Sequence, residues 1–217
     1  MCRSPSSNRR ARASRKAETM VAKDDDTIGF YTDNATAYTS RGQAVDRPHL
    51  EKFLARLHEG ASILELGCGG GQDSEFMLAA GYDVHPTDGT PEIAKAAQAR
   101  LGIPVRTLLF EDIHERERYD GVWANACLLH VPRPALPGII GRIHIALRKG
   151  GVFYASFKAG EAEGRDMFGR YYNYPSKPWL EDVYGQFGWA TVEIEARQGS
   201  GYDQLPTAWL HVTATKT

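Results

Sequence analysis

A glycine-rich stretch lies between an apolar run and the start of a predicted helix, and its residue types could hold a ligand. The sequence ILELGCGGGQDS, residues 63–74, places Gly67, Gly69 and Gly71 at alternate positions. Glycine is costly in regular structure, but it permits backbone conformations and close approaches that a side chain would prevent. We therefore expect the loop to bring backbone N–H groups close to a ligand, where a helix terminus adds positive potential.

An acidic residue ends the next apolar run along the chain. Asp88 follows the stretch YDVHPT, about 20 residues after the glycine loop. A carboxylate at that distance accepts hydrogen bonds from ribose hydroxyls in sites that bind nucleoside cofactors. The glycines and Asp88 together therefore indicate a cofactor that contains a nucleoside.

The spacing of the glycines separates the classes of cofactor site. A dinucleotide site requires G-x-G-x-x-G, and Gln72 stands where its last glycine would be. A Walker phosphate loop ends in Gly-Lys-Ser/Thr, and this loop does not. The pattern is E-x-G-x-G-x-G from Glu65, and an acid directly before the loop suits a cofactor with a cationic amino group better than a pyrophosphate.

This pattern resembles the first motif of class I S-adenosylmethionine-dependent methyltransferases, and the resemblance covers most of the chain from Tyr31. TDGTPE is similar to the second motif of the family, and FEDI follows the third predicted strand. The segment that begins YDGVWANACLLH looks like the fourth strand, helix and fifth strand of the family, and GFYTDNATAY resembles the amino-terminal segment that often closes over the cofactor. The chain is similar to small bacterial type 11/12 and tellurite-resistance-type methyltransferases.

The resemblance implies a set of cofactor-binding residues. The glycines would approach the methionine part of S-adenosylmethionine, Asp88 would hold the ribose, and Asp112 is preferred over Glu111 for the adenine amine. Glu65 would lie near the cofactor amine or stabilise the loop amides, and Cys68 would be a small residue packed beside the cofactor. The implied residues are Tyr31, Tyr38, Glu65, Gly67, Cys68, Gly69, Gly71, Asp88, Gly89, Asp112, Ile113 and Asn125.

Two residues at the ends of predicted strands are the candidate catalytic residues. His130 could be a general base or a substrate contact, or it could only pack and cap the next turn. Lys158 could attract an anionic substrate. Methyl transfer from a sulfonium requires in-line positioning more than acid–base groups, so the reaction does not depend on a catalytic pair.

A polar, glycine-rich and aromatic segment, residues 159–178, is predicted to be a long loop that provides substrate specificity. The expected substrate-binding residues are Arg165, Arg170, Tyr171 and Tyr172. The alternative is a surface loop whose aromatic rings pack on the sheet edge. Trp179, Trp189 and Trp209 are expected to pack in the core or at that edge.

Strands and helices alternate along the part of the chain that positions these residues. The expected strands are residues 61–66, 82–88, 104–110, 119–126 and 150–158. The expected helices are residues 43–58, 72–80, 90–102 and 134–148. Such alternation predicts a parallel sheet with helices on both faces.

The end of the sequence departs from this alternation. A helix is expected at residues 177–187, followed by two stretches of alternating polarity, 189–197 and 207–215, that should form an antiparallel hairpin. The predicted fold is therefore α/β: a Rossmann-like, seven-stranded, mostly parallel sheet with helices on both faces and a C-terminal antiparallel hairpin.

The net charge indicates which binding partners to expect, and the cysteine content indicates the cellular compartment. The formal net charge is −1, which gives no global attraction to nucleic acid or an anionic membrane. No apolar run approaches the roughly 20 residues that span a bilayer. Cys2, Cys68 and Cys127 are far apart and odd in number, which argues against a disulfide framework and for the cytoplasm. No metal site is expected.

The first 26 residues differ in composition from the rest. They are rich in arginine and serine and poor in large apolar residues, so they cannot bury enough surface to offset their ordering entropy. We expect a disordered basic leader at 1–26, such as an extended gene start with Met20 as the true start, and a methyltransferase domain at 27–217. A transit peptide and a nucleic-acid-binding arm are the alternatives.

The expected function is methyl transfer from S-adenosylmethionine to a small molecule, anionic or thiol-bearing, because little chain is left for a macromolecule-binding domain. One alternative is methylation of RNA at a wobble nucleoside, to which the basic leader would contribute. Another is a nucleoside-binding protein without catalysis. The accepting atom and the oligomeric state are not predicted.

Overall fold

The computed structural model describes residues 22–40, 47–202 and 204–217. Residues 1–21 of the predicted leader and residues 43–46 of the first predicted helix lie outside the described residues. The described part of that helix is α3 (Arg47–Leu54). It ends before the predicted residue 58, because the following N–H groups of Arg56 and Leu57 bond to carbonyls three residues back, at 3.1 and 3.0 Å.

Within the described ranges, seven strands form one sheet in the order β3-β2-β1-β4-β5-β9-β8. The pairs among β1 to β5 are parallel, and β9 is antiparallel to both β5 and β8. The predicted mostly parallel sheet with a closing antiparallel hairpin is confirmed. The strands are β1 (Ser62–Leu66), β2 (Asp83–Asp88), β3 (Arg106–Thr107), β4 (Tyr119–Ala124), β5 (Leu147–Lys158), β8 (Trp189–Ser200) and β9 (Pro206–Lys216).

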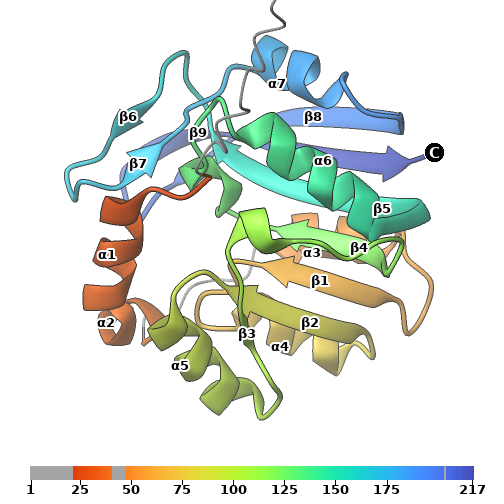
Figure 1. Ribbon diagram of the computed structural model, residues 1–217, viewed down its shortest axis with the longest axis horizontal. Coiled ribbons are helices and arrows are strands. Elements are labelled where there is room, and N and C mark those ends of the chain that lie inside the picture. Colours follow the sequence, from red (N-terminus) through yellow and green to blue (C-terminus); the bar gives the residue numbers. More distant parts are fainter. Residues whose placement is uncertain (1–21, 41–46, 203) are drawn as a thin grey trace, which may run out of the picture.

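Helices pack on both faces of the sheet because side chains of successive strand residues point to opposite faces. On β1, Leu64 and Leu66 join the core cluster under α6 and α7, whereas Ile63 joins the cluster with α3 and α4. Figure 1 shows α6 in front of the sheet and α3 behind it. The helices that follow α3 are α4 (Gln72–Ala79), α5 (Pro91–Leu101), α6 (Leu136–Ala146) and α7 (Lys177–Tyr184).

The segment predicted to be a long loop contains a small second hairpin. Strands β6 (Gly164–Arg165) and β7 (Tyr171–Tyr172) pair antiparallel, with Gly164 opposite Tyr172. The sequence did not predict this hairpin, because two-residue strands leave no alternating pattern. The third predicted strand, 104–110, was also too long: Phe110–Asp112 is a short 3-10 helix, η1.

The amino-terminal helices stand beyond the carboxyl ends of the parallel strands (Figure 1). They are α1 (Asp25–Asp33) and α2 (Ala35–Thr39). α1 begins two residues before the predicted domain start at Thr27. The Asp24 carboxylate caps it by accepting a hydrogen bond from Thr27 N at 2.9 Å. The acidic residues 24–26 therefore belong to the helix and its cap, although we expected them in the leader. None of the described helices is long and apolar enough to cross a membrane.

Candidate active site

A cavity of about 900 Å³ opens at the carboxyl ends of β1, β4 and β5, the sheet edge at which ligands bind in open α/β folds. Its walls come from α1, α2, α3, the glycine loop, β5, β7 and the β8–β9 hairpin. The volume lies in the range of small-molecule sites. The predicted site residues that line it are Tyr31, Tyr38, Glu65, Gly67, Cys68, Gly69, Asn125, His130, Lys158, Arg170 and Tyr172.

The glycine loop has a shape that other residues would strain. Gly67 and Gly69 have backbone φ angles of +63° and +56°, in the region that glycine enters without cost. A Cβ atom on Gly67 would lie 2.5 Å from the Cβ of Cys127, and one on Gly69 would lie 3.3 Å from the Tyr38 ring. Gly71, at +82°, caps the start of α4 and does not line the cavity. The first two glycines therefore let the loop pack closely against Cys127 and Tyr38, and both glycines line the cavity.

Glu65 is buried on β1 and lines the same end of the cavity. The Ser74 hydroxyl on α4 donates a hydrogen bond to its Oε2. Burial raises the pKa of Glu65 to about 8, and the nearby charge of Asp73 adds to the effect. A cationic ligand group would favour the charged carboxylate, so this position suits the amino group of a cofactor.

Asp88 holds the glycine loop in place. Its Oδ2 accepts a hydrogen bond from Gly69 N at 3.1 Å, and its Oδ1 accepts one from Thr90 N at 2.9 Å. Burial raises the pKa of this carboxyl to about 6, against the effect of those bonds. Asp88 and Gly89 do not line the large cavity. The structure therefore gives Asp88 a role in shaping the loop that its sequence position alone did not indicate.

The predicted adenine contacts lie near a second, smaller cavity. Asp112 is exposed, and Ile113 is buried and does not line either cavity. The smaller cavity, about 40 Å³, is lined by Glu111 and by residues of α1. Oε2 of Glu111 is buried without a hydrogen-bond partner. Of the two acids considered for the adenine amine, Glu111 therefore lines the smaller cavity and Asp112 does not.

The two described cysteines are buried free thiols. Burial raises the pKa of both the Cys68 and the Cys127 thiols. The Cys127 thiol donates to the carbonyl of Leu66 at 3.1 Å. Neither is a ready nucleophile, because thiolate formation is disfavoured at both positions.

His130 lies in the short 3-10 helix η2 (Leu128–His130), with both ring nitrogens hydrogen-bonded. Nδ1 lies 2.6 Å from the carbonyl oxygen of Tyr171, so it carries the hydrogen, and Nε2 accepts from the Tyr31 hydroxyl at 3.0 Å. Burial lowers the pKa of His130 to about 4. The ring is therefore a neutral group that links α1 to β7.

Arg170 is only 1% exposed and pairs with Asp166. Its Nε and Nη2 donate to Oδ2 of Asp166 at 2.9 and 2.6 Å, and its Nη1 donates to the Tyr31 hydroxyl at 3.1 Å. Aromatic rings surround the guanidinium, among them Phe30 at 4.8 Å and Tyr202 at 4.6 Å from ring centroid to Cζ. Arg170 thus joins the β6–β7 hairpin to α1 and to the β8–β9 turn.

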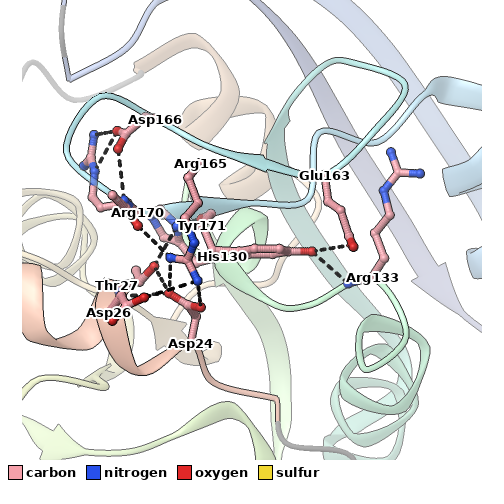
Figure 2. Close-up of polar contacts among 11 residues, drawn as sticks. Asp24, Asp26, Thr27, His130, Arg133, Glu163, Arg165, Asp166, Arg170 and Tyr171 are labelled. Carbon is pink, nitrogen blue, oxygen red and sulfur yellow. Dashed lines mark hydrogen bonds and ion pairs between the residues drawn. The ribbon is translucent and has the colours of Figure 1, made fainter.

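Arg165 and Tyr171 do not line the cavity; Figure 2 shows Arg165 directed to Asp24 and the Tyr171 hydroxyl directed to Glu163. Arg165 Nη2 lies 2.7 Å from Oδ2 of Asp24 and 3.4 Å from Oδ2 of Asp26. The Tyr171 hydroxyl donates to Glu163 at 2.8 Å. These two predicted substrate contacts hold the β6–β7 hairpin against its neighbours instead of lining the site.

Lys158 and Tyr172 do line the cavity. Lys158 is the last residue of β5 and is 6% exposed. Its Nζ lies 4.5 Å from the centroid of the Tyr172 ring. Lys158 therefore places a basic side chain beside an aromatic face in the wall of the cavity.

Several lining residues were missed from the sequence. Asp73 accepts from Trp123 Nε1 at 2.8 Å and from the Asn125 amide at 3.3 Å, and the Ser156 hydroxyl donates to Asn125 Oδ1 at 2.7 Å. The first turn of α4 and the alternation on β5 could have indicated Asp73 and Ser156. The other missed residues lie on α3, on β8 and β9, and in the segment between those two strands. Their place at the cavity depends on helix packing and strand register, which local sequence patterns do not show. They are His49, Lys52, Arg197, Trp209, His211 and Tyr202.

His49 and His211 both line the cavity, and their rings stack. Their ring centroids are 3.8 Å apart at an interplanar angle of 5°. The Tyr154 hydroxyl and His211 Nδ1 are 2.7 Å apart. Across the part of the chain that the structure describes, no three His, Cys, Asp or Glu side chains are grouped to hold a metal ion.

Residues 63–151 match the family model described as a methyltransferase domain. A curated relative, the ubiquinone biosynthesis O-methyltransferase of Xanthomonas axonopodis pv. citri (strain 306), is 33% identical over 121 residues, which cover 52% of this chain and 50% of the relative. The chain thus spans about half the length of the curated relatives it matches.

Solved structures match over more of the chain. The 1,6-didemethyltoxoflavin-N1-methyltransferase of Burkholderia thailandensis, with bound 1,6-didemethyltoxoflavin and S-adenosylhomocysteine, has a TM-score of 0.70 and 26% identity over 89% of this chain and 86% of that one. The magnesium protoporphyrin IX methyltransferase of Synechocystis PCC 6803, with bound S-adenosylmethionine, has a TM-score of 0.67 and covers 92% of this chain and 100% of that one; at 17% identity it shows the fold alone. The comparisons confirm the predicted fold and cofactor class.

Proposed function

We propose that this chain, which carries a class I S-adenosylmethionine-dependent methyltransferase domain, transfers the cofactor's methyl group to a small-molecule acceptor. One observation carries the proposal: the glycine loop and Glu65 share a single cavity with a separate set of aromatic and basic side chains. Methyl transfer requires two ligands held side by side in one enclosed space. A volume of about 900 Å³ suits two small ligands rather than a folded macromolecule.

The residues at the glycine-loop end fit the cofactor. S-adenosylmethionine, when bound, supplies an electrophilic methyl group on a sulfonium. Gly67 and Gly69 present backbone without side chains to its methionine part, and Glu65 has the charge to pair with its amino group. Tyr31 and Tyr38 from the amino-terminal helices close this end, with ring centroids 5.1 Å apart. Asn125 lines the same cavity and is held by Asp73 and Ser156.

The nucleoside half of the cofactor is assigned by resemblance together with the local geometry. Asp88 would accept the ribose hydroxyls in addition to its two backbone N–H groups, because a carboxylate has about four acceptor sites. Gly89 follows it and would face the same part of the ligand. For the adenine amine, Asp112 and Ile113 remain the residues that the resemblance implies, and the buried Oε2 of Glu111 offers a second acceptor.

A small acceptor is supported by the relatives. The Burkholderia thailandensis structure holds a small molecule together with S-adenosylhomocysteine. That enzyme is 26% identical over 89% of this chain, so a site of similar scale is expected here. The basic residues at the other end of the cavity favour an anionic or thiolate acceptor.

We assign different roles to the two candidate catalytic residues, Lys158 and His130. Lys158 and Tyr172 would contact the acceptor, because both line the cavity beside each other. His130 would be a positioning residue: Nε2 is occupied by the Tyr31 hydroxyl, and a pKa of about 4 makes a weak base at neutral pH. Arg170 would hold Tyr31 from the other side, and Arg165 and Tyr171 would support the hairpin from outside.

Calorimetry with S-adenosylhomocysteine tests the cofactor assignment. Asp88→Ala should weaken binding by about 1–3 kcal/mol, because it leaves backbone donors of the loop unpaired. Asp83→Ala, at the exposed start of the same strand, is the matched control and should bind like the wild type. Binding of NADH with none of S-adenosylhomocysteine would overturn the proposal.

The acceptor class is tested separately, with S-adenosylmethionine turnover measured against a panel of small aromatic and aliphatic acids, thiols and phenols and against bulk transfer RNA. Methylation of a panel member is the expected result. Methylation of transfer RNA with none of the panel would replace the small-molecule assignment with the RNA alternative.

A further inference from the structure

Three residues that line the cavity form one row across neighbouring strands. Lys158 on β5 is the register partner of Trp209 on β9, and Trp209 is the partner of Arg197 on β8. Register partners in adjacent strands point to the same face of a sheet. We call Lys158, Trp209 and Arg197 the cation–indole rung, because a lysine and an arginine are the register partners of one tryptophan on the two strands beside it.

All three rung residues line the cavity, and Trp209 also packs against the core cluster under α6. The next residue along β9, Leu210, points to the opposite face and is buried in the α6 cluster. The next residue on the cavity face, His211, stacks on His49 from α3. The rung also lies at the end of β5, the sheet edge where the glycine loop lies, and one cavity is lined by both.

The indole of Trp209 lies against a glycine. A Cβ atom on Gly199, which lies on β8, would be 3.1 Å from Cδ1 and 3.3 Å from Nε1 of the indole. Those separations are closer than ordinary packing allows, so a larger residue at 199 would push the ring away. Trp209 is half-buried, which leaves part of its aromatic surface toward the cavity.

The two cations are held in different ways. Lys158 is almost fully buried, with its Nζ over the Tyr172 ring. Arg197 donates to Glu195 from Nε at 2.8 Å and also from Nη2, and its side chain is 55% exposed. A guanidinium has five N–H donors, so Arg197 can bind a second anion. Neighbouring strands lie about 4.8 Å apart, so the Cα atoms of Lys158 and Arg197 are roughly 10 Å apart, with the Cα atom of Trp209 between them.

We propose that the cation–indole rung binds the methyl acceptor, and that the acceptor is a planar ring system carrying a carboxylate or another delocalised negative charge. This inference rests on the proposed function and names the substrate class of the same site. A planar ring stacks on the indole face. The anionic group pairs with Arg197 through paired N–H donors or with Lys158 as a point charge.

The proposal requires an acceptor that is both planar and anionic, and three probe ligands test these two properties separately. Naphthalene-2-carboxylate is planar and anionic, naphthalene-2-carboxamide is planar and neutral, and cyclohexanecarboxylate is anionic and not planar. Each is titrated by calorimetry or ligand-observed NMR into the full chain saturated with S-adenosylhomocysteine. The naphthoate should bind at least tenfold more tightly than either of the other two.

Substitutions at two rung residues test whether naphthoate binds at the cation–indole rung. Trp209→Leu should weaken naphthoate at least tenfold, and Trp179→Leu on α7 is the matched tryptophan control. Arg197→Ala should reduce the preference for naphthoate over the carboxamide severalfold, and Arg148→Ala, at the other end of β5 and paired with Asp120, is the arginine control. Because the Arg197 side chain is exposed, this variant remains a test if Trp209→Leu fails to fold.

The outcomes distinguish this inference from the proposed function. If the wild type binds S-adenosylhomocysteine but the naphthoate binds no better than the carboxamide, or does not bind at all, the inference is overturned and the proposed function stands. The same holds if Arg197→Ala and Trp209→Leu both keep the wild-type affinity for naphthoate. Failure to bind S-adenosylhomocysteine contradicts the proposed function itself.

Discussion

Two parts of the cavity wall, which we call the cofactor end and the acceptor end after their proposed ligands, are built by different means. At the cofactor end, one short loop contributes backbone to the cavity wall: Gly67 and Gly69 have conformations that a side chain would strain. At the acceptor end, the surface consists of side chains from strands far apart in the sequence, such as the row of Lys158, Trp209 and Arg197.

This difference indicates which structural features determine the shape of each end. The cofactor end is determined by local conformation, so a substitution there acts through backbone shape. The acceptor end is determined by the register of the β8–β9 hairpin and by the packing of α1 against β7, so a substitution there acts through lost contacts and charge. The predictions that follow probe this contrast, from the largest expected effect to the smallest.

Arg170→Ala should cause the largest loss, because Asp166 would remain buried without its cation. Removing one partner of a buried ion pair costs about 3–5 kcal/mol, and the pair here is 2% and 8% exposed at its two side chains. The free energy of unfolding is measured by urea denaturation. The control is Arg165→Ala, whose ion pairs are exposed and should contribute about 0–1 kcal/mol. Equal losses in the two variants would show that Arg170 is not the central contact of α1 and β7.

Gly67→Ala should destabilise the cofactor end by about 2–5 kcal/mol, the sum of left-handed backbone strain and overpacking. It should also abolish measurable binding of S-adenosylhomocysteine. Gly60→Ala is the matched control, because Gly60 has a φ of +70° and no atom within 4 Å of an added Cβ. The control isolates the strain from the clash with Cys127. If both variants behave alike, close packing does not determine the loop.

The affinity for S-adenosylhomocysteine should rise with pH between about pH 6 and pH 8. The pKa of Glu65 in the free protein is raised to about 8, so the carboxyl is protonated below that pH. A bound ammonium group favours the carboxylate, and binding therefore releases a proton. Affinity then increases by up to about tenfold per pH unit and levels off above pH 8.

Calorimetry in buffers of different ionisation enthalpy measures the released proton directly. Glu65→Gln is the control and should show a flat profile over the same range. A wild-type affinity that is constant or falls from pH 6 to pH 8 would place the ligand's amino group away from Glu65.

The smallest effect concerns the start of the domain. A chain beginning at Ala22 should match the stability of the full sequence, whereas one beginning at Thr27 should lose about 1–2 kcal/mol. The loss combines the helix cap of Asp24 with its exposed pair to Arg165. Asp24→Asn keeps a capping side chain without the charge and should lose about half as much. Equal melting temperatures for the two shortened chains would contradict the capping role.

Much of the cofactor end could be predicted from the sequence, because its signals are local. Glycine spacing indicated the loop, and alternating polarity and helical periodicity indicated the parallel sheet. The bonds from Asp88 to Gly69 N and Thr90 N could not be predicted, because a carboxylate that faces a ligand and one that holds a loop look alike in a sequence.

The acceptor end could be predicted only in part. Lys158 and Tyr172 were found because a strand end and an aromatic loop are visible in the sequence. Trp209 was expected to pack, and it does pack against the core, but its place beside Lys158 follows from the pairing of β9 with β5. Arg165 and Arg170 look equivalent in sequence, yet one is exposed beside Asp24 and the other is buried beside Asp166.

The order of the strands has a consequence for how the chain is assembled during translation. β9 lies between β5 and β8 in the sheet, although β8 precedes it in the chain. When β8 leaves the ribosome, it has no neighbour to pair with, and β5 keeps an open edge until β9 is synthesised. An unpaired edge strand is a template for aggregation. We therefore expect nascent chains halted before residue 206 to bind the glycine-loop ligand poorly and to associate with one another, whereas release of the last strand should close the sheet and complete the acceptor end in one step.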